Sequence, residues 1–145
     1  MKTILDFINE SIDNGLKDIK QNLKDKKPFF VENENIKDVM SAAKEIGYMV
    51  VKLYLDKAEP SDMESFSNNG QKVLPQWAGK IVNNDKNCVF LLIDDTGKVN
   101  PKVLNAIMPI VIDNEICGKK YDNFVPVVST TDFSKLPKPM QSKLK

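Results

Sequence analysis

The sequence feature that most constrains the fold is an apolar run that ends on two carboxylates. Val89 to Ile93 is unbroken by any polar residue, and Asp94 and Asp95 follow it directly. Such a run is typical of a central strand covered on both faces, as in the parallel sheets of α/β proteins. Open α/β sheets bind ligands at the carboxyl ends of their strands, so this pair could hold a metal and orient a water. The other interpretation is a polar strand end that enters a turn.

Strands and helices are predicted to alternate along the rest of the chain. Strands are expected at residues 28–32, 48–55, 89–93 and 124–129, helices at 1–26, 36–46, 73–82 and from 101 onward, and a polar loop at 56–70. A turn or hairpin is expected at 115–121, and a loose tail or short helix after 130. This alternation predicts an α/β fold: a three-layer αβα sandwich with a mostly parallel sheet.

Several residues allow predictions about the ends and interruptions of helices and strands. Asn35, with Asp38 three residues later, resembles a capping box at the start of the second helix. Gly47 fits a left-handed C-cap at its end. Pro109 should kink or shorten the helix that Pro101 opens. Pro126 indicates an irregularity in the last strand.

The first 26 residues are predicted to form an amphipathic helix outside the main domain, which spans residues 27–145. Its apolar residues recur at three- and four-residue steps: Leu5, Ile8, Ile12, Leu16, Ile19 and Leu23. This stripe either packs on the domain's own sheet or contacts a partner chain, for example as a short coiled coil.

Composition removes His-based chemistry and leaves other classes of function without specific support. A net charge of +1 in 145 residues gives no electrostatic argument for nucleic acid or for a membrane surface, and no apolar run reaches the roughly 18 residues of a membrane helix. The absence of histidine removes His-based catalysis and His-ligated zinc. All 21 basic residues are lysines, so the chain has no guanidinium for a phosphate. This bias fits an A+T-rich genome of a bacterium or phage, and the expected compartment is the cytoplasm, or the host cytoplasm for a phage protein.

A resemblance to a known family rests on an ordered succession of motifs. The run VFLLIDDTGKVNPKVLNAIMPIVIDNEICGKKYDNFVPVVST resembles the second half of a MoxR-type AAA+ ATPase core: a Walker B strand, an Asn-Pro-led helix with a Leu-Asn-Ala motif, a hairpin and the sensor 1 strand. Upstream, EPSDMESF and LPQW resemble the loop and helix before Walker B, and PFFVENENIKDVMSAAKEIGYMVV takes the place of the first strand, phosphate loop, helix and second strand. The resemblance covers roughly residues 27–142 and implies a P-loop NTPase fold.

The resemblance also assigns positions to individual residues. Asp94 matches the Mg²⁺-coordinating carboxylate, Asp95 the catalytic glutamate, and Thr131 or Asp132 the sensor 1 asparagine. Lys37 stands at the lysine of the phosphate loop. The stretch ENENIKDV at this loop has no glycine, carries two glutamates, and has an aspartate where the Mg²⁺-binding hydroxyl belongs. The chain supplies no arginine finger, and it ends where the helical lid would begin.

These departures predict an AAA+-like protein that has kept the scaffold and lost nucleotide hydrolysis. Asp94, Asp95, Asp132 and Lys37 would then be vestigial, no cofactor is expected, and the protein would bind other proteins as a structural or assembly subunit. The partner would be an AAA+ ATPase or a larger assembly, and a homo-oligomer is left open.

Two alternatives remain from the sequence. In the first, Asp94 and Asp95 complete an Mg-ATP site with the phosphate loop of a partner chain. In the second, the protein associates with nucleic acid through exposed lysines, namely Lys119, Lys120, Lys135, Lys138, Lys143 and Lys145.

Overall fold

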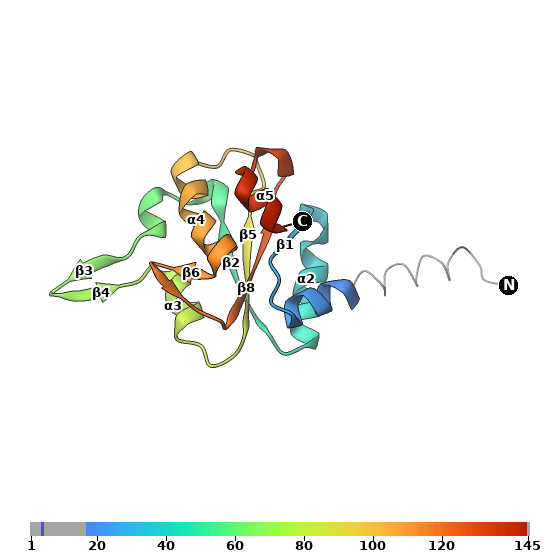
Figure 1. Ribbon diagram of the computed structural model, residues 1–145, viewed down its shortest axis with the longest axis horizontal. Coiled ribbons are helices and arrows are strands. Elements are labelled where there is room, and N and C mark those ends of the chain that lie inside the picture. Colours follow the sequence, from blue (N-terminus) through green and yellow to red (C-terminus); the bar gives the residue numbers. More distant parts are fainter. Residues whose placement is uncertain (1–3, 5–16, 145) are drawn as a thin grey trace.

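The centre of the fold is a four-stranded parallel sheet, seen in a computed structural model that describes residue 4 and residues 17–144 (Figure 1). Its strands are β1 (Phe29–Val31), β8 (Phe124–Ser129), β5 (Cys88–Ile93) and β2 (Met49–Tyr54), in that spatial order. β5 and β8 are central and buried along their whole length. The predicted α/β class, with a parallel sheet, is confirmed.

Helices cover both faces of this sheet because the side chains of β5 alternate between two cores. Its residues 89, 91 and 93 face α2 (Ile36–Glu45) and the helical residues 17–24. Its residues 88, 90 and 92 face α3 (Gln76–Val82), α4 (Pro101–Asp113) and α5 (Lys138–Leu144). A strand apolar at every position is therefore explained by burial on both sides.

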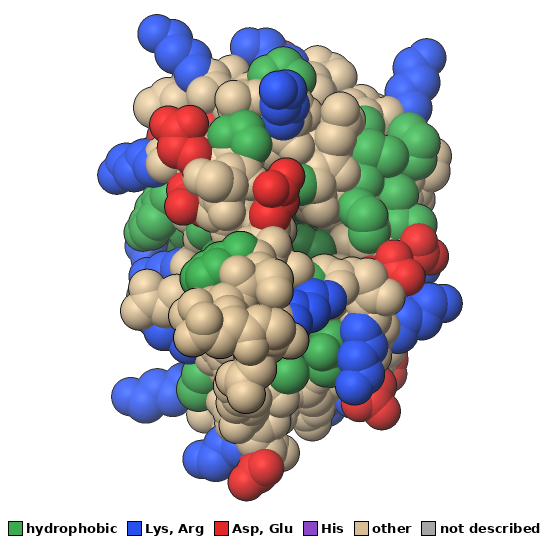
Figure 2. All heavy atoms as spheres, turned by 90° about the vertical axis from the view of Figure 1, so that its left-hand side faces the viewer, with side chains coloured by type: hydrophobic (Ala, Val, Ile, Leu, Met, Phe, Trp, Pro, Cys, Tyr) green, Lys and Arg blue, Asp and Glu red, His purple; other side chains and the backbone are tan. Residues whose placement is uncertain are grey.

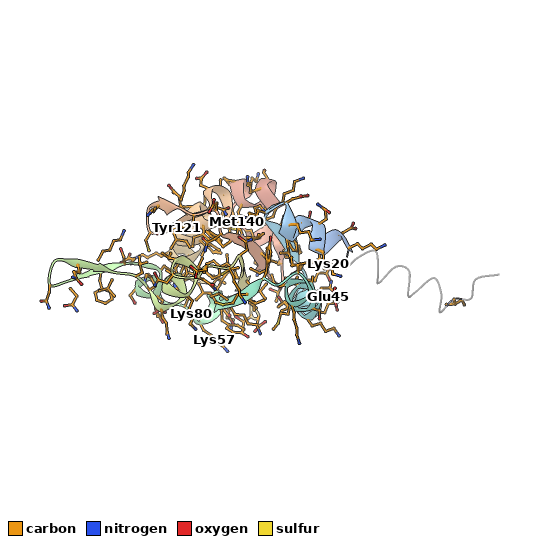
Figure 3. All side chains as sticks on the ribbon, turned by 90° about the horizontal axis from the view of Figure 1, so that it is seen from below. Lys20, Glu45, Lys57, Lys80, Tyr121 and Met140 are labelled. Atoms are coloured by element: carbon orange, nitrogen blue, oxygen red, sulfur yellow. The ribbon has the colours of Figure 1, made fainter. Side chains whose placement is uncertain are left out.

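The helical residues 17–24 belong to the predicted first helix and pack on the domain. Leu23 is fully buried among residues of α2, β5 and β8, and Ile19 packs against the same core. An ion pair between Lys20 and Glu45 joins this segment to α2 (Figure 3). None of the helices in residues 17–144 is long and apolar enough to cross a membrane.

Two antiparallel hairpins and four short 3₁₀ turns complete the described chain. β3 (Phe66–Asn68) and β4 (Gln71–Val73) form a hairpin that projects from the body, and β6 (Glu115–Ile116) and β7 (Lys119–Lys120) form the second hairpin (Figure 1). The 3₁₀ turns are η1 (Asn33–Asn35), η2 (Leu55–Lys57), η3 (Pro60–Met63) and η4 (Phe133–Lys135). The expected loop at 56–70 was thus wrong at its end, where β3 begins. The expected helix at 73–82 starts only at Gln76, because Val73 belongs to β4.

The two ends of α2 differ in how well sequence predicted them. Asn35 precedes the helix but makes no side-chain capping bond, because η1 leads directly into α2 and Asn35 is part of that turn. The predicted capping box with Asp38 is therefore wrong. Gly47 has φ 79°, and the backbone N–H of Tyr48 bonds back to the carbonyl of Ala43 at 2.8 Å, which confirms the left-handed C-cap.

Neither predicted proline irregularity interrupts its element. α4 continues through Pro109 to Asp113, because Pro109 is exposed and the carbonyl it leaves unbonded belongs to the exposed Asn105. Pro126 lies inside the continuous central strand β8. β1 pairs with β8 only from Val127 onward, so Pro126 has a neighbouring strand on one side only, which is β5. The N–H that proline lacks therefore need not interrupt the hydrogen bonds between strands.

Candidate functional site

Side-chain hydrogen bonds tie together the loops that follow three strands of the sheet. Asn33 follows β1, Asp94 follows β5, and Ser129 ends β8. The Asn33 side-chain amide donates to the Asp94 carbonyl oxygen at 3.1 Å, and the Ser129 hydroxyl donates to the Asn33 side-chain oxygen. Parallel strands place their carboxyl ends at one edge, and open α/β sheets bind ligands there. This edge is the candidate site that the sequence predicted.

The carboxylate of Asp94 is engaged in hydrogen bonds from its own surroundings. Oδ1 accepts the backbone N–H groups of Thr96 at 3.2 Å and Gly97 at 2.8 Å, and Oδ2 accepts the hydroxyl of Thr130 at 3.0 Å. The residue is only 6% exposed. Hydrogen bonds to a charged acceptor are the stronger kind. Asp94 therefore holds the turn after β5 closed and joins it to the end of β8.

Little of this carboxylate is left for a cation. A carboxylate offers about four acceptor positions, and the three donors occupy most of those of Asp94. Mg²⁺ needs an octahedral set of oxygen ligands. No cluster of three or more acidic, histidine or cysteine side chains suited to a metal occurs in the described residues. The residues around Asp94 thus donate hydrogen bonds where a magnesium site would need oxygen ligands, and they do not fit Mg²⁺.

The other sequence-predicted residues of this edge make no hydrogen bond to the Asp94 carboxylate within the described chain. Asp95 and Thr131 are exposed. Asp132 caps η4, accepting the backbone N–H of Ser134 at 3.0 Å and its hydroxyl at 2.5 Å. These hydrogen bonds hold the pKa of Asp132 below its ordinary value, and the bond from the Ser134 hydroxyl has the larger effect. Asp132 therefore acts as a local cap.

The residue after β8 that bonds to the Asp94 carboxylate is one that sequence analysis did not select. Ile93 pairs with Ser129, so Asp94 and Thr130 are the next residues of β5 and β8. It is Thr130, buried, whose hydroxyl reaches the carboxylate. This bond follows from the register of β8 against β5, which the sequence pattern does not give.

The segment that the resemblance places at the phosphate loop carries negative charge. Glu32 and Glu34 are both exposed, and the hydrogen bond that protonated Glu32 donates to Glu34, together with the charge of Glu34, raises the pKa of Glu32. Lys37 is exposed on the first turn of α2 and makes no side-chain hydrogen bond or ion pair within the described chain. No backbone cradle surrounds this lysine, because η1 runs straight into the helix.

A cavity of about 620 Å³ opens at this edge between the loops after β1 and β8. Its lining consists of two aromatic rings, polar groups and three carboxylates, with no lysine: Phe30, Glu32, Asn33, Glu34, Thr130, Thr131, Asp132 and Phe133. Like charges repel, so such a lining disfavours a triphosphate. The cavity has the size of a ligand pocket, but its charge is wrong for the nucleotide that the resemblance implies.

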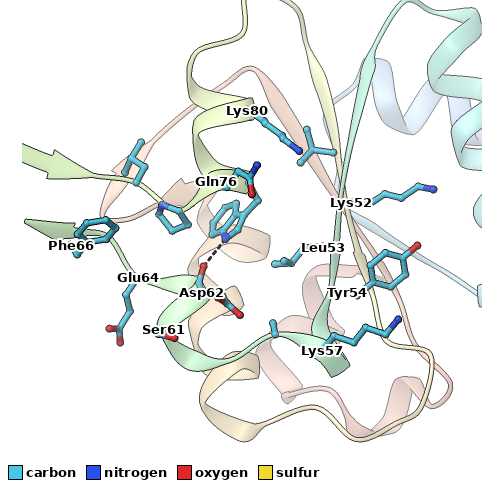
Figure 4. Close-up of a pocket in the computed structure, with 15 residues that line it drawn as sticks. Lys52, Leu53, Tyr54, Lys57, Ser61, Asp62, Glu64, Phe66, Gln76 and Lys80 are labelled. Atoms are coloured by element: carbon cyan, nitrogen blue, oxygen red, sulfur yellow. Dashed lines mark hydrogen bonds between the residues drawn. The ribbon is translucent and has the colours of Figure 1, made fainter.

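A second hollow, which sequence analysis did not find, lies beside the free edge of β2. This β2 groove, of about 540 Å³, lies between β2, the β3–β4 hairpin and α3 (Figure 4). Trp77 lies in it, stacked on Phe90 at 5.0 Å and donating its indole N–H to the Asp62 carbonyl at 2.8 Å. The hairpin residues are mostly polar and exposed, so they gave no hydrophobic pattern from which the groove could be predicted.

The predicted partner-binding stripe is only partly within the described chain. Ile19 and Leu23 pack on the domain's own sheet, as one of the two interpretations expected. The other members of the stripe, Leu5, Ile8, Ile12 and Leu16, lie outside the described residues.

Comparison with models of protein families and with curated proteins found no family and no relative that matches this chain.

Proposed function

We propose that the chain is a catalytically inactive AAA+-like protein that acts by binding other proteins, as a structural or assembly subunit. The observation that supports this proposal most directly is the hydrogen bonding of Asp94, the residue that the resemblance places at the Walker B aspartate. The backbone N–H groups of two residues and the Thr130 hydroxyl occupy most of the acceptor positions of its carboxylate. In a working ATPase this aspartate would be a magnesium ligand. In this protein it accepts hydrogen bonds that hold two loops together.

The order of the strands supports the AAA+-like part of the proposal. The positions that the resemblance assigns to the phosphate loop, Walker B and sensor 1 follow β1, β5 and β8. β8 lies between the other two, so the three positions share one edge of the sheet. A nucleotide site requires this adjacency, and the order of the strands is consistent with it.

The charge at that edge supports the loss of nucleotide binding. The cavity beside η1 is lined by Glu32, Glu34 and Asp132, and no lysine enters it. Lys37 stands on α2 without the glycine-rich backbone turn that closes around phosphates. The fold depends on core packing, whereas the nucleotide site depends on a few surface residues. A protein can therefore lose the site and keep the fold.

Thermal unfolding with and without nucleotide tests this proposal. A ligand that binds only the folded state stabilises it by about 2.7 kcal/mol at one hundred times its Kd, which raises the Tm of a domain of this size by roughly 5–10 °C. We expect no rise in Tm with millimolar Mg-ATP or Mg-ADP. A clear rise that Asp94→Asn abolishes would overturn the proposal and favour an ATPase site completed with a partner chain.

A further inference from the structure

Four large hydrophobic side chains are exposed in the described chain. Tyr54 (38% exposed) on β2 and Phe66 (58%) on the neighbouring hairpin both line the β2 groove, whereas Met49 (37%), at the other end of β2, does not. The remaining one is Ile4 (80%), in the N-terminal segment. Exposed apolar side chains that gather at one place indicate a contact surface.

The edge of the sheet at β2 is open. β2 pairs with β5 on one side, and no other described strand pairs with it. An edge strand with free backbone groups is a place where another chain can associate. The β2 groove lies along this strand, and its size is within the roughly 300–1,000 Å³ of ligand pockets.

The β2 groove joins an apolar floor to a basic rim. Apolar side chains come from β2, the hairpin and α3: Leu53, Phe66, Leu74, Pro75 and Trp77. Figure 4 shows Lys52, Tyr54 and Lys57 on the side of β2 away from Leu53, and Lys80 on α3, so the lysines border the apolar floor from two sides. Figure 2 views the molecule from the hairpin side and shows hydrophobic side chains exposed between lysines and acidic groups.

The three lysines of this rim have no acidic partner within residues 17–144. No ion pair of Lys52, Lys57 or Lys80 occurs there, and Lys57 instead lies 5.1 Å from the ring of Tyr54. Lys57 and Lys80 lie on the same side of the molecule (Figure 3). Two acidic residues also line the groove: Asp62 accepts the backbone N–H of Glu59 at 2.8 Å, and Figure 4 shows the Glu64 carboxylate pointing away from the lysines. The groove therefore suits an occupant that carries apolar side chains together with carboxylates.

The first 16 residues, MKTILDFINESIDNGL, have this character. Four apolar residues of the predicted stripe fall in them, and Asp6, Glu10 and Asp13 follow one another at steps of four and three, against the single Lys2. In the helix that the sequence predicts, this spacing places the three carboxylates on one side, next to the apolar stripe. Their number matches the three rim lysines.

The groove and the helical residues 17–24 lie at opposite ends of the described domain. Residues 17–24 lie against α2, whereas the β3–β4 hairpin that borders the groove projects from the other end (Figure 1). The first 16 residues join the domain at residue 17, at the end away from its own groove, so we take the groove of a second molecule as their docking site.

We propose that residues 1–16 of one copy of this chain dock in the β2 groove of a second copy. The apolar stripe covers Phe66 and the groove floor, and the carboxylates lie near Lys52, Lys57 and Lys80. The proposal rests on the protein-binding function proposed above and names its partner. Because the two contacting surfaces differ, the contact is head-to-tail, and copies add to one another unless the rotation closes a ring.

The test is the mass of the full chain in solution, measured by sedimentation over a range of concentrations. We expect the wild-type mass to rise with concentration above that of one chain. The triple variant Lys52→Glu, Lys57→Glu, Lys80→Glu replaces attraction by repulsion and should weaken association by about tenfold or more. The matched control Lys98→Glu, Lys102→Glu, Lys138→Glu has the same charge change at exposed sites outside the groove and should associate like the wild type.

A charge exchange decides whether the lysines act through the N-terminal segment. Adding Asp6→Lys, Glu10→Lys and Asp13→Lys to the groove triple should restore association, and an excess of a peptide of residues 1–16 should dissociate the wild type. A wild-type mass that stays at one chain, or a charge exchange that restores nothing, would overturn this proposal. Neither result bears on nucleotide binding, so a failure here and a failure of the proposed function are distinguishable.

Discussion

The hydroxyl of Thr130 donates a 3.0 Å hydrogen bond to Oδ2 of Asp94, across the carboxyl ends of the two central strands. This bond gives the acidic group at the predicted catalytic position a structural partner. With the N–H groups of Thr96 and Gly97 on Oδ1, it makes Asp94 a junction between two loops. The stability of the domain should therefore depend on this carboxylate.

Asp94→Asn should destabilise the protein by about 1–3 kcal/mol, because the amide loses the charge and replaces one acceptor oxygen by a donor. Chemical denaturation measures this difference in free energy of unfolding. Asp95→Asn is the matched control, since Asp95 is exposed, and it should change stability by less than about 0.5 kcal/mol. Equal losses in the two variants would argue against a special structural role for Asp94.

Thr130→Val should cost about 1–2 kcal/mol, because it keeps the shape of the buried side chain and removes the donor to Asp94. Thr131→Val, at the exposed neighbouring position, should be close to neutral. A double-mutant cycle with Asp94→Asn isolates the pair, and we expect the two losses to be less than additive. Full additivity would mean that the two side chains act independently.

Gly97→Ala should destabilise more than Gly70→Ala. Both glycines have left-handed φ values, 76° and 79°, which cost an alanine about 1 kcal/mol or more. A Cβ on Gly97 would also lie 3.1 Å from Oγ1 of Thr131, whereas at Gly70 it meets nothing within 4 Å. Thermal unfolding compares the two variants, and an equal loss in both would show that the turn after β5 yields easily.

Two carboxyl groups should titrate away from their ordinary values in opposite directions. Hydrogen bonds from Ser134 lower the pKa of Asp132, so this group contributes stability above its unfolded pKa and loses it as pH falls through the folded one. The bond and charge of Glu34 raise the pKa of Glu32, so that contribution is present at low pH and is lost as pH rises through the folded pKa.

Carboxyl NMR titration measures both values. Ser134→Ala should raise the pKa of Asp132, and Glu34→Gln should lower that of Glu32. Each variant leaves the other pair intact and serves as its control. Unchanged pKa values in both variants would contradict the assigned causes.

Sequence predicted the parts of the fold that burial and capping determine. The strand from Val89 to Ile93 is apolar because both its faces are covered, and Asn100 with Pro101 opens α4, where the Asn100 side chain accepts the N–H of Lys102 at 2.9 Å. The β3–β4 hairpin was missed because it is exposed, and an exposed strand carries no hydrophobic period.

The candidate site was predicted in position but not in its bonds. Asp94 follows a strand whose apolar run is plain in the sequence, so its place at the sheet edge could be foreseen. Thr130 could not, because its bond depends on the register of β8 against β5, which no local pattern encodes. The same register decides that Thr131 and Asp132 point to other neighbours.

The most direct measurement follows the backbone amide NMR signals of Thr96 and Gly97, whose N–H groups bond to Asp94, during a titration with Mg-ATP. Asp94→Asn is the positive control and should shift both signals. We predict that millimolar Mg-ATP leaves them unchanged, because the carboxylate is already bound within the protein. Saturable shifts of both signals with Mg-ATP, absent in Asp94→Asn, would contradict the claim that this aspartate has become a structural residue.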